Sequence, residues 1–540
     1  MNRRDFLQLA ALGTAGTALA GEAGSASLKQ NRAAASAIRV KPFEWDGATI
    51  VELQTAMSSG RETSISLSKK YLERIEELDR RGPVLNAVIE LNPDAMSDAR
   101  RLDQERKTKG SRGPLHGIPV LLKDNIDTHD RMMTSAGSLS LLGSIPLRDS
   151  AVARKLREAG VVILGKSNLS EWANFRSNHS TSGWSARGGQ TKNPHVLDRN
   201  PSGSSSGSAA AVAASLCAVA IGTETDGSIV SPSSFCGIVG IKPTLGLISR
   251  AGIIPIAASQ DTAGPMARTV ADAAILLGAL TGVDPNDPAT ESSAGNSRKD
   301  YTSFLTPDGL RGARIGVARE FFHSHALDAK AMEGALEAMK QSGATLVDPA
   351  DVPAGGKFGD AEEEVLLYEF KAGLNAYLAG LGSQAPVKTL KAVIEFNEQN
   401  KEKEMPFFGQ ELFLKAEEKG PLTDKAYVEA LATCRRLSRD EGIDAMMSRH
   451  QLDAVVAPSG GPAHRIDLIY GDRDTGGSSS LAAVAGYPSI TVPAGQVFGL
   501  PVGISFFGRA YSEPTLLKIA FAFEQATQAR KMPGFLPTVG

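Results

Sequence analysis

Cysteine is scarce in this 540-residue sequence, and histidine follows no recognisable pattern. Cys217, Cys236 and Cys434 are an odd number of widely spaced residues without a CxxC pair. Neither a disulfide framework nor a zinc site is therefore indicated. The 8 histidines show no HExxH or similar spacing, which argues against a catalytic metal. We expect no metal and no other cofactor.

An excess of charge of one sign is also lacking. The sequence has 58 basic and 60 acidic residues, and its net charge is -2. No overall field would therefore attract nucleic acid or an anionic membrane. A hydrophobic share of 42% is ordinary for a globular protein. We expect a peptide or small-molecule partner and no nucleic acid.

The N-terminal apolar run is too short to span a bilayer. It extends from Phe6 to Ala20 and is diluted with glycine and threonine, whereas a membrane helix needs roughly 20 apolar residues. Arg3 and Arg4 precede it, which is the layout of a twin-arginine signal. We expect a signal peptide over residues 1–26, no membrane association after its removal, and a periplasmic or secreted bacterial protein exported folded. The alternative is an ordered amphipathic helix.

Short apolar runs that alternate with helical patterns indicate an α/β protein. Residues 118–122, 161–164 and 218–221 are typical of strands, and residues 151–159 are typical of a helix. Strand patterns return in the last 90 residues. The helical pattern over residues 361–447 predicts a separate layer, because a single core is usually limited to roughly 250 to 300 residues.

Two loops rich in glycine and serine lie one helix and one short strand apart. The first, residues 201–208, reads Pro-Ser-Gly-Ser-Ser-Ser-Gly-Ser, and the second, residues 222–229, reads Gly-Thr-Glu-Thr-Asp-Gly-Ser-Ile. Either loop alone is most often a flexible turn or an anion cradle. The short connection between them lets both face one cleft at the edge of the sheet.

These loops resemble the amidase signature family. The match runs from Gly203 to Thr244 and includes the serine-rich loop, an alanine-rich helix, the second loop, and the later F-C-G and K-P-T. Residues 117–124, 261–268 and 499–503 match as well. The resemblance implies a single main domain over residues 45–530, with a large mixed β-sheet covered by helices on both faces. Residues 361–447 would then form a helical subdomain on the substrate side.

The resemblance also implies the catalytic residues: Ser228 as nucleophile, Ser204 on a cis peptide as bridging serine, and Lys123 as base. A serine hydroxyl is a poor nucleophile without a base, and neither loop contains histidine. A buried lysine can serve if its pKa falls from about 10.4 to about 7 to 8. The Ser204 hydroxyl can relay the proton because it both donates and accepts.

The second loop is expected to supply the oxyanion hole from the backbone N–H groups of Thr225, Asp226, Gly227 and Ser228. Family members commonly have glycine in place of Asp226 and arginine in place of Val230. A carboxylate aimed at the oxyanion would oppose catalysis. We expect Asp226 to point away and to bind a substrate amine or another side chain. The alternative is a structural turn residue.

Residues 203–207 also satisfy GxSxG, the nucleophile motif of α/β-hydrolases. That motif needs an apolar strand before it, and residues 193–201 are polar and bounded by proline. An α/β-hydrolase is therefore not indicated. The Ser66-Leu67-Ser68-Lys69 match to SxxK lies in an outer amphipathic helix and lacks the partner motifs.

Within the family the chain is similar to bacterial peptide amidases, which remove ammonia from C-terminal carboxamides. Residues 177–190 and 408–411 carry this similarity. It implies substrate binding by Trp184, Arg187 and Gln190, and no required partner protein. The alternatives are a broad-specificity hydrolase of small or aryl amides, a binding protein without catalysis, and, for residues 177–190, a surface loop without function.

Overall fold

The computed structural model describes residues 38–322, 326–352, 357–383 and 385–539. The predicted signal peptide, residues 1–26, lies outside this part of the chain.

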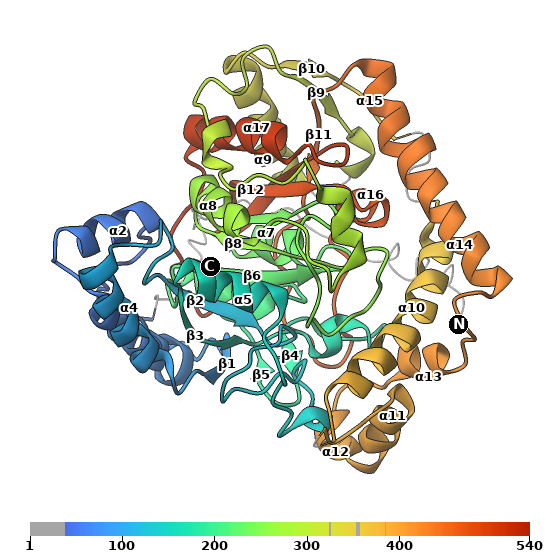
Figure 1. The fold of residues 1–540 in the computed structure, drawn as a ribbon. Coiled ribbons are helices and arrows are strands. Elements are labelled where there is room, and N and C mark those ends of the chain that lie inside the picture. Colours follow the sequence, from blue (N-terminus) through green and yellow to red (C-terminus); the bar gives the residue numbers. More distant parts are fainter. Residues whose placement is uncertain (1–37, 323–325, 353–356, 384, 540) are drawn as a thin grey trace, which may run out of the picture. The chain divides into compact units, whose positions relative to one another are not determined.

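One mixed sheet of 11 strands runs through the described residues (Figure 1). In order across the sheet the strands are β1 (Val88–Leu91), β3 (Val162–Ser167), β2 (Pro119–Lys123), β6 (Val219–Glu224), β8 (Thr262–Ala267), β7 (Val239–Lys242), β12 (Ser489–Val497), β13 (Leu500–Phe507), β11 (Ala454–Pro458), β9 (Arg314–Val317) and β10 (Thr345–Val347). Strands β3, β2 and β6 are parallel, as are β11, β9 and β10, and the strands between these groups are antiparallel. A separate hairpin pairs β4 (Trp184–Ser185) with β5 (Gly189–Gln190).

Helices cover both faces of this sheet. They are α2 (Ile50–Ser58), α3 (Ser64–Ile75), α4 (Ala95–Lys109), α5 (Ala151–Ala159), α6 (Ser206–Ala213), α7 (Val230–Phe235), α8 (Val270–Leu280), α9 (Ala326–Gln341), α10 (Gly359–Gly380), α11 (Leu390–Gln399), α12 (Lys401–Glu404), α13 (Glu411–Glu417), α14 (Lys425–Arg435), α15 (Asp444–His450), α16 (Ser479–Ala485) and α17 (Glu513–Thr527). Helix α17 packs against α8 and α9, whereas α6 and α7 contact each other and the same sheet. The predicted α/β fold with a large mixed sheet is confirmed. Among the described residues, no helix has the length and apolar character to span a membrane.

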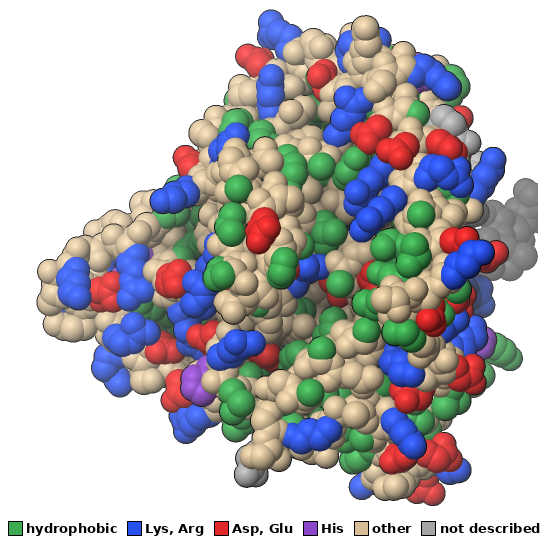
Figure 2. All heavy atoms as spheres, turned by 45° about the vertical axis from the view of Figure 1, so that its right-hand side comes forward, with side chains coloured by type: hydrophobic (Ala, Val, Ile, Leu, Met, Phe, Trp, Pro, Cys, Tyr) green, Lys and Arg blue, Asp and Glu red, His purple; other side chains and the backbone are tan. Residues whose placement is uncertain are grey.

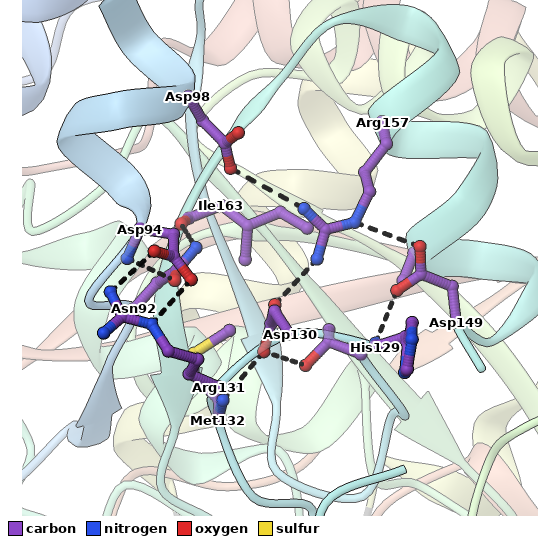
Figure 3. Close-up of polar contacts among 12 residues, drawn as sticks. Asn92, Asp94, Asp98, His129, Asp130, Arg131, Met132, Asp149, Arg157 and Ile163 are labelled. Atoms are coloured by element: carbon purple, nitrogen blue, oxygen red, sulfur yellow. Dashed lines mark hydrogen bonds and ion pairs between the residues drawn. The ribbon is translucent and has the colours of Figure 1, made fainter. Parts of the chain in front are cut away.

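Helix α5 anchors the long loop that follows β2. It begins after Ser150, whose side chain accepts the N–H of Ala153, and ends at Gly160 in the left-handed region. The guanidinium of Arg157 lies 2.7 Å from Asp130 and 3.1 Å from Asp149, both in that loop. Figure 3 shows these carboxylates around Arg157, with Asp98 of α4 on its other side. The loop is therefore tied to α5, and Arg157 also joins α5 to α4.

Helices α10 to α15, residues 359–450, form a layer that we call the helical cover. In Figure 1, α10 to α14 lie together on the right, away from α2 and α4. Phe370 and Phe413 of the cover pack with Trp172, Phe175 and Ile256, which belong to loops outside it. The cover is thus held by an apolar core that it shares with residues outside it. Its position on the substrate side remains a proposal.

The surface carries charges of both signs. Figure 2, which brings the side of the helical cover forward, shows lysine and arginine side chains interspersed with aspartate and glutamate. Hydrophobic side chains are scattered among them. This face has no extended field of one sign, in keeping with the net charge of -2.

Candidate active site

Lys123 stands at the end of β2, beside the parallel strand β6. The register places Leu122 opposite Ile221, and the Lys123 side chain reaches Thr223, farther along β6. Its Nζ lies 2.8 Å from Thr223 Oγ1 and 3.2 Å from the Thr223 carbonyl oxygen. Its third contact is with Ser204, 2.7 Å from Nζ to Oγ. The Lys123 amine therefore joins β2, β6 and the first serine-rich loop.

The Lys123 amine has no exposed surface. Burial lowers the pKa of Lys123 to about 7, against the opposing influence of the carboxylates of Asp261 and Glu224. At neutral pH a large share of the amine is therefore uncharged. An uncharged amine has a lone pair that can accept a proton, which an ammonium lacks.

Ser204 is placed by a tightly packed loop. The Gly203-Ser204 peptide bond is cis, and the Ser170 N–H donates to the Ser204 carbonyl at 3.1 Å. A Cβ added at position 203 would lie 2.2 Å from Ser170 Oγ, so this close approach requires glycine. Ser204 has no exposed surface, and α6 begins two residues later. Its hydroxyl is consequently fixed toward Lys123.

Ser228 lies on the turn between β6 and α7 and is 8% exposed. The Ser205 N–H donates to the Ser228 carbonyl at 3.2 Å, which joins the two loops. Gly227 has a φ of +77°, a region that glycine adopts without strain. No hydrogen bond links the Ser204 and Ser228 hydroxyls within the described chain. The structure thus joins Ser204 to Lys123 directly and brings Ser228 into the same pair of loops.

The backbone N–H groups of residues 225–228 make no hydrogen bond to any described residue. The next two N–H groups, of Ile229 and Val230, donate to the Glu224 carboxylate at 2.7 and 3.0 Å. The Ser231 N–H donates to the Gly227 carbonyl at 2.8 Å and closes the turn. The hydrogen bonds of residues 229–231 therefore hold the turn in place, and the four N–H groups of residues 225–228 remain available to a ligand.

Asp226 points away from these donors toward α16. Its two carboxylate oxygens accept the hydroxyls of Ser479 and Ser480, each at 2.6 Å. Burial raises the pKa of Asp226, and the two serine hydroxyls counteract that rise. The sequence left open whether Asp226 binds a substrate amine or another side chain of the protein. In the structure it binds side chains of the protein.

Two adjoining cavities open at this turn. The first, about 350 Å³, contains Ser228 and is lined by Ala173, Asn174, Phe175, Asn178, Gly203, Thr225, Asp226, Ser228, Ile256, Gly359, Glu362, Glu363, Leu366 and Leu412. The second, about 200 Å³, is lined on the Lys123 side by Asn125 and Thr223. Ala173, Thr225 and Ile256 line both. The helical cover supplies part of the wall that faces Ser228.

Trp184 and Gln190 face each other across the β4/β5 hairpin. The Trp184 ring lies edge-on to Phe408, with ring centroids 5.2 Å apart. The Gln190 amide donates to the carbonyls of Ser182 and Thr191, both at 2.8 Å. Neither side chain lines the two cavities, so their predicted role in substrate binding stays a prediction.

Arg187 is engaged by carboxylates of the protein. Its guanidinium pairs with Glu90 and lies 3.4 Å from Asp124, the residue after Lys123. It also donates to Ser135 Oγ at 3.1 Å. Arg187 lines neither cavity, and a substrate contact by it likewise stays a prediction.

Sequence reasoning did not single out Thr223, Gln260 and Glu362. Thr223 stands beside Lys123 because of the β2/β6 register, which a strand pattern alone does not give. Gln260 directly precedes the matched stretch 261–268 and donates to the Thr225 carbonyl at 3.3 Å. Glu362 reaches the cavity only through the packing of the helical cover, and no local signal marks it.

No group of three His, Cys, Asp or Glu side chains among the described residues is arranged to hold a metal ion. The expectation that the protein needs neither metal nor cofactor stays a prediction.

Comparisons with known proteins all identify amidases as similar to this chain. The Amidase family model matches residues 66–517. A probable amidase of Arabidopsis thaliana is 46% identical over 95% of this chain and 96% of its own length. A Schizosaccharomyces pombe protein, likewise named as an amidase, is 38% identical over 91% of this chain and 87% of its own. The crystal structure of the native peptide amidase from Stenotrophomonas maltophilia is 52% identical, with a TM-score of 0.87 over 92% of this chain and 100% of that one.

These relatives correct the predicted localisation. The predicted periplasmic or secreted localisation by the twin-arginine route is wrong on this comparison, because curated relatives that match nearly the whole chain include amidases of a plant and a fission yeast, which have no periplasm. The prediction depended on Arg3, Arg4 and a short apolar run. Such a pattern is only a few residues long and lies outside the described part of the chain.

Proposed function

The chain belongs to the amidase family, and from that premise we propose that it hydrolyses the C-terminal carboxamide of peptides to the acid and ammonia. The observation that carries the proposal is the buried contact of 2.7 Å between Lys123 Nζ and Ser204 Oγ, beside the Ser228 turn. Similarity to the Stenotrophomonas maltophilia peptide amidase supports the substrate class.

In the proposed first step, Ser228 Oγ attacks the carboxamide carbon. Its proton passes to Ser204, whose own proton passes to the uncharged Lys123 amine. The Ser228 hydroxyl must turn toward Ser204 when substrate binds, since catalytic hydrogen bonds are often loose without substrate. The negative charge on the carbonyl oxygen is stabilised by the N–H groups of residues 225–228.

Collapse of this intermediate breaks the carbon–nitrogen bond. Lys123 returns its proton through Ser204 to the leaving nitrogen, which departs as ammonia and leaves an acyl group on Ser228. Water then attacks the acyl carbon, and the same relay removes its proton. The carboxylic acid is released, and Ser228 and Lys123 return to their starting states.

The test uses one peptide in three forms: C-terminal amide, C-terminal acid, and extended by one residue. Ammonia and fragments are followed by mass spectrometry, with Ser228→Ala protein as the control. We expect ammonia from the amide alone. Cleavage of the extended form at a comparable rate would make the protein a general peptidase. Faster turnover of an aryl amide such as benzamide would favour the broad-specificity alternative.

A further inference from the structure

Glu362 of α10 lines the same cavity as Ser228. Its Oε1 accepts a hydrogen bond of 2.9 Å from the Gln260 amide. That amide, in a side chain only 2% exposed, also donates to the Thr225 carbonyl. Gln260 therefore fixes Glu362 relative to the turn that carries Ser228. No donor among the described residues contacts the other oxygen, Oε2.

The remaining charges of this cavity are already neutralised or bound. Asp226 and Glu363 are its other acidic lining residues, and no lysine, arginine or histidine lines it. Both oxygens of Asp226 accept serine hydroxyls, and Glu363 pairs with Lys415 at 2.8 Å. Glu362 is consequently the acidic residue of this cavity that has an oxygen without a hydrogen-bond partner and also lacks a paired cation among the described residues.

No lysine, arginine or histidine among the described residues pairs with Glu362. Asp226 repels the negative charge of Glu362, whereas the hydrogen bond from Gln260 favours the ionised carboxyl. Glu362 in turn disfavours the anion of the buried Cys434 thiol on α14. Lys242 acts on Asp226 instead. Burial, together with the Asp226 charge, raises the pKa of Glu362 to about 8. A cation placed at Oε2 would remove this penalty, because an opposite charge favours the ionised carboxyl.

We propose that Glu362 selects substrates whose cleaved carboxamide belongs to a residue with a positively charged side chain. The inference rests on the proposed function, because it takes the Ser228 cavity as the place where that residue binds. A cavity of about 350 Å³ is within the range of small-ligand pockets. The cationic group would occupy the open side of Glu362 while the carboxamide reaches Ser228.

The experiment compares N-acetyl-lysinamide with N-acetyl-norleucinamide, which has a similar carbon chain and no charge. We expect kcat/KM to be about 10-fold higher for the lysine compound, the range expected of one charge-assisted contact. In Glu362→Gln the ratio should fall to about 1. Glu364→Gln is the matched control, since Glu364 also lies on α10, pairs with Lys419 at 2.6 Å and does not line the cavity. It should keep the wild-type ratio.

The pH dependence of the wild-type ratio gives a readout that needs no variant. Glu362 attracts a cation only when ionised, so the ratio should rise as pH increases through about 8. Lys123 acts equally on both substrates and cancels. A wild-type ratio of 1 or below, a pH-independent ratio, or an unchanged ratio in Glu362→Gln would each overturn the proposal. If the protein hydrolysed neither of these compounds and no other peptide amide, the proposed function itself would be refuted.

Discussion

Lys123 contacts Ser204, and Asp226 lies next to Gly227 in the turn that carries Ser228. In both cases the neighbouring groups decide what the ionisable side chain can do. The Lys123 amine has no exposed surface, and this burial favours its uncharged form against the opposing influence of nearby carboxylates. Asp226 is turned to the hydroxyls of Ser479 and Ser480, which removes its charge from the N–H groups of the turn. The family resemblance was enough to predict Lys123 as the base. The sequence predicted that Asp226 points away from the turn, but its partners on α16 lie more than 250 residues away and could not be identified locally.

The pH dependence of catalysis should follow the Lys123 amine. Because burial lowers its pKa to about 7, the base is protonated and inactive below that pH and uncharged above it. We expect kcat/KM for a neutral peptide amide to rise with pH through about 7 and then to level off. Lys123→Ala should lower turnover by at least about 10³-fold at every pH.

The control for this prediction is Lys155→Ala. Lys155 is also partly buried, but its Nζ contacts the Thr281 carbonyl rather than a serine hydroxyl. Near-normal turnover in Lys123→Ala at neutral pH would refute the role of the amine as base.

At the scale of elements, the sequence predicted the outer layers better than the centre of the sheet. The helix expected over residues 151–159 is α5, and the run 118–122 became β2 with a shift of one residue. Strands β7 and β8 were not predicted. Strand β8 reads Thr-Ala-Gly-Pro-Met-Ala, in which glycine and proline oppose a strand assignment. Antiparallel partners on both sides overrule that local preference.

Arg157 provides a test of how the loop after β2 is held. Leucine at this position would leave Asp130, whose side chain is 8% exposed, and Asp149 without their cation. We expect the free energy of unfolding, measured by urea denaturation, to fall by about 1 to 3 kcal/mol. Protection from hydrogen exchange should fall first in residues 124–150.

Arg154→Leu serves as the comparison on the same helix. Arg154 pairs with Glu158 at 3.1 Å on the surface, with side chains 48% and 63% exposed, and such pairs contribute little. Equal losses in both variants would show that Arg157 does not anchor the loop.

On the scale of the described chain, the helical cover and the loops around Ser228 share one apolar core. Phe413 is fully buried, stacks on Phe370 at 5.2 Å and meets Trp172 edge-on at 5.7 Å between ring centroids. Trp172 is followed by Ala173, which lines both cavities. Motions of the cover are therefore linked to the cavity wall by direct packing.

Phe413→Ala should expose this link. Removing a buried phenylalanine side chain costs about 3 to 5 kcal/mol, and the loss should appear as faster hydrogen exchange in both α10 and residues 172–175. We also expect KM for peptide amides to rise more than kcat falls. Leu414→Ala, at a neighbouring position that is 51% exposed, should change neither the hydrogen exchange of these segments nor KM. Faster exchange confined to the cover would contradict the packing argument.

The two parts that meet at the cavity come from separate stretches of the sequence. Lys123, Ser204 and Ser228 all lie within residues 123–228, whereas the wall that contains Glu362 comes from residues 359–450. Under the proposed function, substitutions in this wall should change substrate choice without altering Lys123, Ser204 or Ser228, as long as the apolar contacts around Phe413 persist. The separation implies that a segment of the cover could be exchanged for that of a related chain while the residues proposed for catalysis stay unchanged.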